Sequence, residues 1–385
     1  MLDVPVKRTF APVAVLAAGA FAVGTDAFVV AGFLPQLAAS LEVSETAAGQ
    51  SVTAFAVAYA ILSPVLATVT ARLSRRELLA GALLLLALAN LGSALAPTFA
   101  VLLVTRVVAA AGAAAFTPNA GAVAAALSRP EARGRALATV VGGLTVATAA
   151  GVPLGGLAGQ WLGWRAALGL VAGACVVVAA AVYVILPALP GEPPVPLRVR
   201  LRVLRRPAVP AVLALTVLGM AATYTVYAYS APAMRAVGVE STASMLFLYG
   251  LGAVLGNLAA GYATDRWGAG RVLMTGYVVM AASLAGLGWL AGSQDVPVVL
   301  VGLLATGWGA GTWCQTPPQQ HRLIGVAPGE ASLVVSLNAS AIYVGIGAGT
   351  LAGGLTLAYG VAVTYAAGAA LAVLALLLVA ATRRV

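Results

Sequence analysis

The chain of 385 residues is 62% hydrophobic and only 8% charged. Soluble domains are roughly 45–50% apolar and about 25% charged, so this composition excludes a soluble globular protein. The net charge of +10 does not indicate nucleic-acid binding, because the basic residues lie in short segments between apolar runs and not on one face of a soluble fold.

Apolar runs recur along the whole chain and predict twelve membrane-spanning helices, each near the roughly 20 residues needed to cross about 30 Å of hydrocarbon. The first run follows Lys7 and Arg8, as in a signal peptide, but it continues past Gly32 without a cleavage site and is predicted to be a span. The fold class is therefore an all-α polytopic membrane protein. The predicted spans cover residues 11–34, 47–70, 78–96, 99–126, 136–158, 166–187, 208–230, 242–264, 271–291, 297–318, 331–355 and 361–381.

The basic residues separate to two sides of these spans. One side has eighteen of them and the other has Arg165 and Arg235, while Arg106 lies inside a span. Because cytoplasmic loops carry the excess of Lys and Arg, both termini are predicted to be cytoplasmic, in a bacterial inner membrane. The eighteen are Lys7, Arg8, Arg72, Arg75, Arg76, Arg129, Arg133, Arg135, Arg198, Arg200, Arg202, Arg205, Arg206, Arg266, Arg271, Arg322, Arg383 and Arg384.

The longest connection divides the chain into two six-helix bundles, residues 1–188 and 208–385, joined by a linker over 189–207. The linker contains Pro190, Pro193, Pro194 and Pro196, which prevent a continuous helix, and then an arginine-rich stretch. It is interpreted either as a tether or as a regulatory, lipid-sensing segment, since arginines can bind anionic headgroups.

A weak internal repeat crosses this linker at an offset near 195. GAAAFTP (Gly112 to Pro118) corresponds to GTWCQTP (Gly311 to Pro317), and GGLAG from Gly155 corresponds to GTLAG from Gly349. Parallel six-span repeats predict two pseudo-symmetric bundles with a substrate site near the midplane between them.

Several motifs resemble those of the major facilitator superfamily. GYATDRWGAGRVL (Gly261 to Leu273) is similar to its cytoplasmic loop signature, with Asp265 and Arg266. The N-terminal counterpart keeps Arg72 but has Ala71 where the family has an acidic residue. The fourth span carries a similar buried-arginine motif, LLVTRVVAAAG, around Arg106.

The fifth-span sequence GVPLGG, with Gly151, Pro153, Gly155 and Gly156, resembles the motif of drug:proton antiporters. These residues also suit close helix packing and a bend. GTDAFVVAGFLP, from Gly24, is similar to the first span of arabinose-efflux, chloramphenicol and purine exporters, but its acid, Asp26, stands one residue earlier than in those relatives.

Asp26 is the only acidic residue well inside a predicted span, and Arg106 is the only basic one. Counted from Pro35 and Phe99 at about 1.5 Å per residue, both lie roughly 10–14 Å below the outer surface, which allows an ion pair. Burial disfavours a charged carboxylate and a nearby arginine favours it, so a conformational change could move a proton. Three roles stay open: proton coupling, a static structural pair, or direct substrate contact.

Polar and aromatic side chains within the spans are candidates for a substrate cavity that suits amphipathic or ring-bearing molecules. Cys175 and Cys314 are interpreted as small hydrophobic residues, and His321 as part of a solvated helix end. No metal site, cofactor or enzyme motif is indicated. The candidates are Gln50, Thr53, Tyr59, Asn119, Tyr224, Tyr227, Asn257, Trp308, Gln315 and Asn338.

These observations predict a proton-coupled secondary transporter that exports small amphipathic molecules, such as drug-like compounds, sugars or nucleobases, by alternating access. Its partners are the substrate, protons and the lipid bilayer, and a monomer is expected to function. The alternatives are a gradient-driven importer or uniporter on the same fold, and a membrane-embedded enzyme, against which the missing catalytic clusters argue.

Overall fold

The computed structural model describes residues 10–129, 132–191, 196–239, 241–293 and 296–381. Twelve helices in these ranges are long and apolar enough to cross a membrane, which confirms the predicted fold class. Large apolar side chains such as Leu88, Val184 and Leu258 are exposed on the outside of the helices, as lipid-facing residues must be. Lys7, Arg8, Pro193, Pro194, Arg383 and Arg384 lie outside the described residues.

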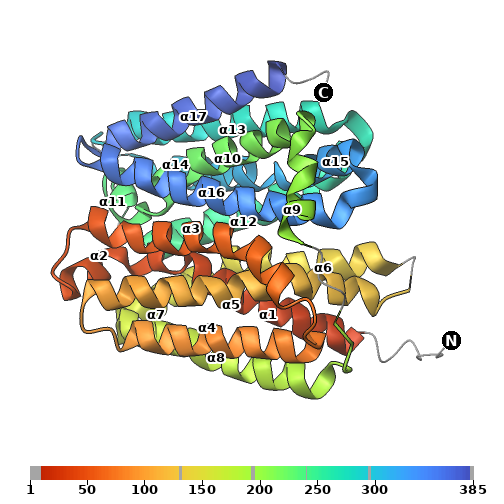
Figure 1. Cartoon of the computed structure of the whole chain (residues 1–385). Coiled ribbons are helices and arrows are strands. Elements are labelled where there is room, and N and C mark those ends of the chain that lie inside the picture. The colour runs from red at the N-terminus through yellow and green to blue at the C-terminus, as the bar shows by residue number, and fades with distance from the viewer. Residues whose placement is uncertain (1–9, 130–131, 192–195, 240, 294–295, 382–385) are drawn as a thin grey trace.

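The first half of the chain forms one group of helices, at the bottom of Figure 1. Ser44, Ser74 and Thr98 cap three of these helices by accepting a hydrogen bond from the first-turn backbone. The helices are α1 (Phe10–Phe28), α2 (Val30–Ser40), α3 (Glu45–Val69), α4 (Arg75–Ala94), α5 (Phe99–Ala126), α6 (Arg133–Val146), the π-turn η3 (Ala147–Gly151), α7 (Val152–Leu162) and α8 (Trp164–Ile185).

The second half forms the other group, at the top of Figure 1. Two short helices of the linker lead into it. The helices are α9 (Leu197–Arg200), η4 (Leu201–Arg205), α10 (Ala208–Tyr227), α11 (Ser230–Arg235), α12 (Thr242–Trp267), α13 (Ala269–Leu290), α14 (Val298–Trp313), α15 (Thr316–Val326), η5 (Pro328–Glu330), α16 (Ala331–Leu357) and α17 (Val361–Ala381).

Two spans are broken at corresponding places in the repeat. The first breaks between α1 and α2, with Phe33 also non-helical, and the seventh breaks between α10 and α11. The flanking residues Val29 and Tyr229 are 200 positions apart, close to the repeat offset. The predicted ends at 34 and 230 do not coincide with helix ends, because α1 and α10 end at Phe28 and Tyr227 and short helices then continue to Ser40 and Arg235.

The tenth span is also longer than predicted. Pro317 and Pro318 interrupt it, but they fall in the first turn of α15, where a missing backbone N–H costs no helical hydrogen bond. The helix therefore restarts and continues to Val326.

The start of α1 and the end of α17 lie at the same end of the helices (Figure 1). The described arginines of the loops gather at this end, which we call the basic end, while Arg165 and Arg235 lie at the opposite end. The linker packs at the basic end: the Arg75 amide donates to the Leu189 carbonyl, and Arg206 pairs with Glu330 at 3.1 Å. The division of the chain at 189–207, and the side that faces the cytoplasm, stay predictions.

Candidate functional site

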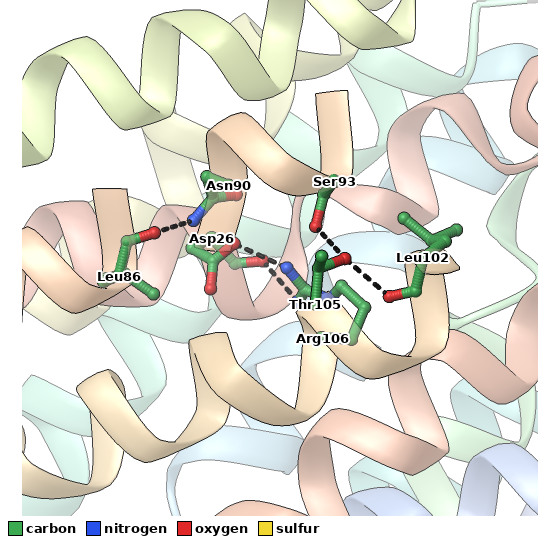
Figure 2. Close-up of polar contacts among 7 residues, drawn as sticks. All are labelled: Asp26, Leu86, Asn90, Ser93, Leu102, Thr105 and Arg106. Carbon is green, nitrogen blue, oxygen red and sulfur yellow. Dashed lines mark hydrogen bonds and ion pairs between the residues drawn. The ribbon is translucent and has the colours of Figure 1, made fainter. Parts of the chain in front are cut away.

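Asp26 and Arg106 form a fully buried ion pair (Figure 2). Arg106 Nη1 donates to Asp26 Oδ1 at 2.6 Å, and Nη2 donates to the main-chain carbonyl of Asp26 at 3.1 Å. Both side chains are 0% exposed. Charge-assisted hydrogen bonds of this length are strong, and the low-dielectric surroundings strengthen them further.

The break in the first span lies directly beside this pair, since α1 ends at Phe28, two residues after Asp26. A second helix, α2, continues to Ser40, five residues past Pro35, and the depth of Asp26 counted from Pro35 stays a prediction. Arg106 holds the last turn of α1 through both a side-chain and a main-chain oxygen. The pair therefore connects α5 to the hinge-like part of the first span.

One oxygen of the carboxylate remains free. Asp26 Oδ2 and the Asn90 side-chain oxygen are both buried and have no hydrogen-bond partner among the described residues. Figure 2 shows Asn90 on the side of Asp26 away from Thr105, with its amide nitrogen donating to the Leu86 carbonyl at 3.0 Å. A free, buried carboxylate oxygen is a position at which a proton can bind without breaking an existing hydrogen bond.

An aromatic stack links the ion pair to the other half of the molecule. The Arg106 guanidinium lies 4.6 Å from the centre of the Phe55 ring, in cation–π geometry. Phe55 contacts Tyr343 of α16 at 6.1 Å, and Tyr343 stacks on Tyr59 of α3 at 3.6 Å between ring centres. Tyr59 thus lies between the halves, at a contact with α16.

Six further aromatic residues form a second contact between the halves, which we call the aromatic cluster. It brings together three predicted cavity residues, Tyr224, Tyr227 and Trp308. Ring centres are 4.8 to 6.4 Å apart, with mostly tilted or edge-on geometry. The cluster consists of Phe28 from α1 with Tyr224, Tyr227, Tyr249, Trp308 and Trp313 from the second half.

Four polar atoms inside the aromatic cluster are buried and make no hydrogen bond with the described residues. They are Tyr227 Oη, Tyr249 Oη, Trp308 Nε1 and Trp313 Nε1. Buried polar groups are usually satisfied, so several unsatisfied donors in one cluster are a reason to look for a ligand. A molecule with aromatic or apolar surface and hydrogen-bond acceptors matches this environment.

The remaining predicted cavity residues do not gather in the aromatic cluster. Asn119 accepts a hydrogen bond from Arg75 at 3.0 Å, Gln315 accepts one from Tyr277 at 3.0 Å, and Asn338 accepts one from Thr216 at 2.8 Å. Gln50 donates to the Thr46 carbonyl at 3.3 Å, near the opposite end. Thr53 and Asn257 are half-buried, on α3 and α12.

The fifth-span glycines bring three helices into close contact. A Cβ atom on Gly151 would overlap Thr25, one on Gly155 would overlap Val29, and one on Gly32 would lie 2.9 Å from the Gly156 Cα atom. The π-turn η3, just before Pro153, also contacts Gly250 of α12 in the second half. The motif therefore lies where the broken first span meets the second half.

The loop motifs lie at the basic end. The backbone of Arg72 packs directly against Gly191 of the linker. Asp265 and Arg266 end α12 with exposed side chains, and Arg266 donates to the Tyr262 hydroxyl at 3.2 Å.

Contacts also close the opposite end. Arg235 of α11 pairs with Glu45 of α3 at 3.1 Å, and Tyr229 lies against Gly49. Cys175 and Cys314 are free and buried, His321 is exposed, and no group of three or more potential metal ligands occurs among the described residues.

Comparison with known proteins identifies the family. The sequence model of the Major Facilitator Superfamily matches residues 16–320 and 211–385. The chain belongs to the major facilitator superfamily. It is a multi-pass membrane transporter of that family and not an enzyme.

Relatives within the superfamily cover nearly the whole chain. It is 32% identical to the inner membrane transport protein YdhP of Escherichia coli K12 over 96% of this chain and 95% of that protein. It is 34% identical to a chloramphenicol resistance protein of Streptomyces lividans, over 90% and 89%. These relatives are consistent with the resemblance to exporters of the drug:proton antiporter branch.

Solved major facilitator structures share the fold. A D-xylose–proton symporter has a TM-score of 0.76 at 17% identity and covers 96% of this chain and 97% of its own. A bacterial homologue of the human lysosomal transporter Spinster, inward-facing and occupied, has a TM-score of 0.75 at 16% identity and covers 97% and 96%. At these identities the likeness concerns the fold alone.

Sequence reasoning missed half of the aromatic cluster and the residues that link it to the ion pair. Phe28, Tyr249 and Trp313 belong to the cluster, and Phe55 and Tyr343 link the ion pair to α16. Phe28 could have been identified from the sequence, because it lies two residues after Asp26. The others are ordinary span aromatics in a major facilitator chain with 25 Phe, Trp and Tyr residues, and only the packing selects them.

Proposed function

We propose that this chain is a proton-coupled exporter of small amphipathic molecules that works as a monomer in the bacterial inner membrane. The single observation that carries the proposal is the buried Asp26–Arg106 pair, which joins a broken span to an aromatic contact with the other half. Ionisable residues within membrane spans are costly and are usually functional. The excess of arginine supports placing the basic end in the cytoplasm.

The proton binds at Asp26 Oδ2, the carboxylate oxygen that accepts no hydrogen bond from a described residue. Protonation removes the negative charge, so Arg106 keeps only its bonds to neutral oxygens and its contact with Phe55. Since Phe55 contacts Tyr343, a shift of the guanidinium changes the contact between α3 and α16. Proton binding is thereby linked to the movement of one half against the other.

The substrate binds at the aromatic cluster, to which both halves contribute. Tilted and edge-on rings suit a planar or apolar body, while Tyr227 Oη and Trp308 Nε1 donate to its acceptor oxygens or nitrogens. The relative named for chloramphenicol resistance supports chloramphenicol as the first probe.

Alternating access uses the contacts between the halves. The Glu45–Arg235 pair and the Tyr229–Gly49 contact hold the opposite end closed, and the glycines around η3 form the smooth surface against which α12 and the broken span can move. An exposed ion pair is worth roughly 0.2–1 kcal/mol, so it can break and re-form in each cycle.

Proteoliposomes with an imposed pH gradient test this proposal. An acidic lumen should drive labelled chloramphenicol into vesicles by exchange with protons, whereas a symporter needs an acidic exterior and a uniporter responds to neither. Asp26→Asn should bind substrate but lose the response to the gradient. Glu77→Gln, an exposed carboxylate at the start of α4, is the matched control and should transport normally.

If Asp26→Asn transports at the wild-type rate under the pH gradient, the proposal fails, and the Asp26–Arg106 pair has only a structural role. If chloramphenicol is not moved, a thermal-shift screen of drugs, sugars, nucleobases and metabolites identifies the probe for the same experiment.

A further inference from the structure

A groove of about 550 Å³ lies between α12, α13 and α14, and none of the residues that line it belongs to the aromatic cluster or the ion pair. Its floor consists of small residues from all three helices, including Gly256, Gly276 and Gly311, so the backbones themselves form part of the wall. Nothing in the proposed transport cycle uses this groove. Its volume lies within the range of roughly 300–1,000 Å³ typical of ligand sites.

The position of the groove along the helices matches one leaflet of a bilayer. It extends from Trp267, at the end of α12, to Val279, ten residues after the start of α13 at Ala269. At 1.5 Å per residue this is about 15 Å, half of the roughly 30 Å hydrocarbon thickness. An extended acyl chain of the leaflet at the basic end can therefore occupy it along its length.

Arginine and aromatic side chains surround the mouth of the groove at the basic end. Arg271 lines it with an exposed side chain, and Arg266 stands beside it, bonded to the exposed Tyr262. The Trp267 side chain is 56% exposed there, which is unusual for so large an apolar side chain on the surface of a soluble protein. Exposed Trp and Tyr at this level are typical of the membrane–water interface.

The two arginines are not neutralised within the described part of the chain, where neither forms an ion pair with a carboxylate. Asp265 is exposed nearby and leaves a net charge of +1 at the mouth, since two arginines oppose one aspartate. Anionic headgroups are attracted to basic residues at this depth.

We propose that this groove is a binding site for an anionic phospholipid, with one acyl chain on the glycine floor and the headgroup phosphate at Arg271 and Arg266. The apolar groove alone would accept any lipid. The charge at its mouth selects an anionic one over a zwitterionic one, and the adjoining Trp267 reports its occupancy.

Fluorescence quenching by brominated lipids tests the site. The purified full chain is placed in nanodiscs of phosphatidylcholine that contain increasing amounts of brominated phosphatidylglycerol or, in parallel, brominated phosphatidylcholine. The Trp267 signal is the difference between wild type and Trp267→Phe. We expect phosphatidylglycerol to quench this signal at several-fold lower mole fraction than phosphatidylcholine.

Two pairs of variants separate headgroup binding from chain binding. Arg271→Gln should weaken the preference for phosphatidylglycerol about fivefold, since one arginine contributes about 1 kcal/mol at an anionic surface. Arg135→Gln, at the exposed start of α6, should leave it unchanged. Ala259→Leu fills the groove and should reduce quenching by both lipids, whereas Ala370→Leu, exposed on α17, should not.

Equal quenching of Trp267 by the two brominated lipids, or an Arg271→Gln variant with the wild-type preference, would overturn the proposal. Protection of Trp267 that increases with the number of chains per nanodisc would also overturn it, because a second copy of the chain would then cover the groove.

Discussion

Removing one charge of the Asp26–Arg106 pair should cost far more stability than removing both. Neither side chain is exposed, and the two charges meet at 2.6 Å. Asp26→Asn leaves a buried guanidinium that cannot lose its proton, and an uncompensated buried charge costs about 3–5 kcal/mol. The double variant Asp26→Asn/Arg106→Gln removes both charges and should recover most of this loss, because a hydrogen-bonded neutral pair carries no such penalty.

Arg106→Gln should behave differently from Asp26→Asn as the pH changes. It leaves a buried carboxylate, which can be neutralised by a proton at the free oxygen. Its stability relative to wild type should therefore rise as the pH falls, by at most about 1.4 kcal/mol per pH unit. The deficit of Asp26→Asn should stay constant, since its unpaired arginine does not titrate in this range.

Unfolding of the four proteins in one nanodisc composition, at two pH values, gives the coupling energy between the residues. Transport measured on the same preparations separates stability from function. A double variant no more stable than Asp26→Asn, or a cost below about 1 kcal/mol for Asp26→Asn, would refute the reasoning, because it would mean that the pair is not desolvated.

Three smaller perturbations test the surroundings of the site. Gly32→Ala forces a methyl group to within 2.9 Å of the α7 backbone and should destabilise by about 1–3 kcal/mol in thermal unfolding, whereas Gly142→Ala, with open space around it, should not. Tyr227→Phe removes a hydroxyl that no described residue bonds, so binding titrations should show weaker substrate affinity with unfolding unchanged. Glu45→Gln breaks the exposed pair with Arg235, so a thiol reagent added from the opposite end should label a single cysteine introduced between the halves at most about fivefold faster.

The spans could be predicted because the bilayer thickness sets the length of each apolar run and the basic residues collect in the loops on one side, and both patterns are visible in the sequence. Asp26 and Arg106 were selected for the same reason, as the only charges well inside the predicted spans. The break near Tyr229 does have a signal in the sequence, since Pro232 stands in the first turn of the helix that follows it. The break near Val29 has no adjacent proline and depends on packing between helices far apart in the chain, such as the contact of Gly155 with Val29.

The polar cavity residues show the limit of residue type as evidence. Every polar group within a bilayer needs a partner, and the sequence does not tell whether the partner is another helix or a ligand. Gln315 and Asn338 are satisfied by Tyr277 and Thr216 of neighbouring helices, while Tyr227 is not satisfied by any described residue. A missing hydrogen-bond partner, and not polarity alone, therefore separates a candidate ligand-binding residue from one that only joins helices.

The two halves differ in the kind of polar group that they bury. The second half buries neutral networks, in which the hydroxyls of Thr223 and Thr312 lie 2.6 Å apart and Thr223 also donates to the Met280 sulfur at 3.1 Å. Such groups do not change charge between pH 5 and 8, so the proposed proton coupling is expected to begin in the first half, at Asp26. If the proposed function holds, the contact between Phe55 and Tyr343 is where this charge change reaches the second half. Substitution of Tyr343, which leaves Phe55 in contact with Arg106, should then uncouple transport from the proton gradient.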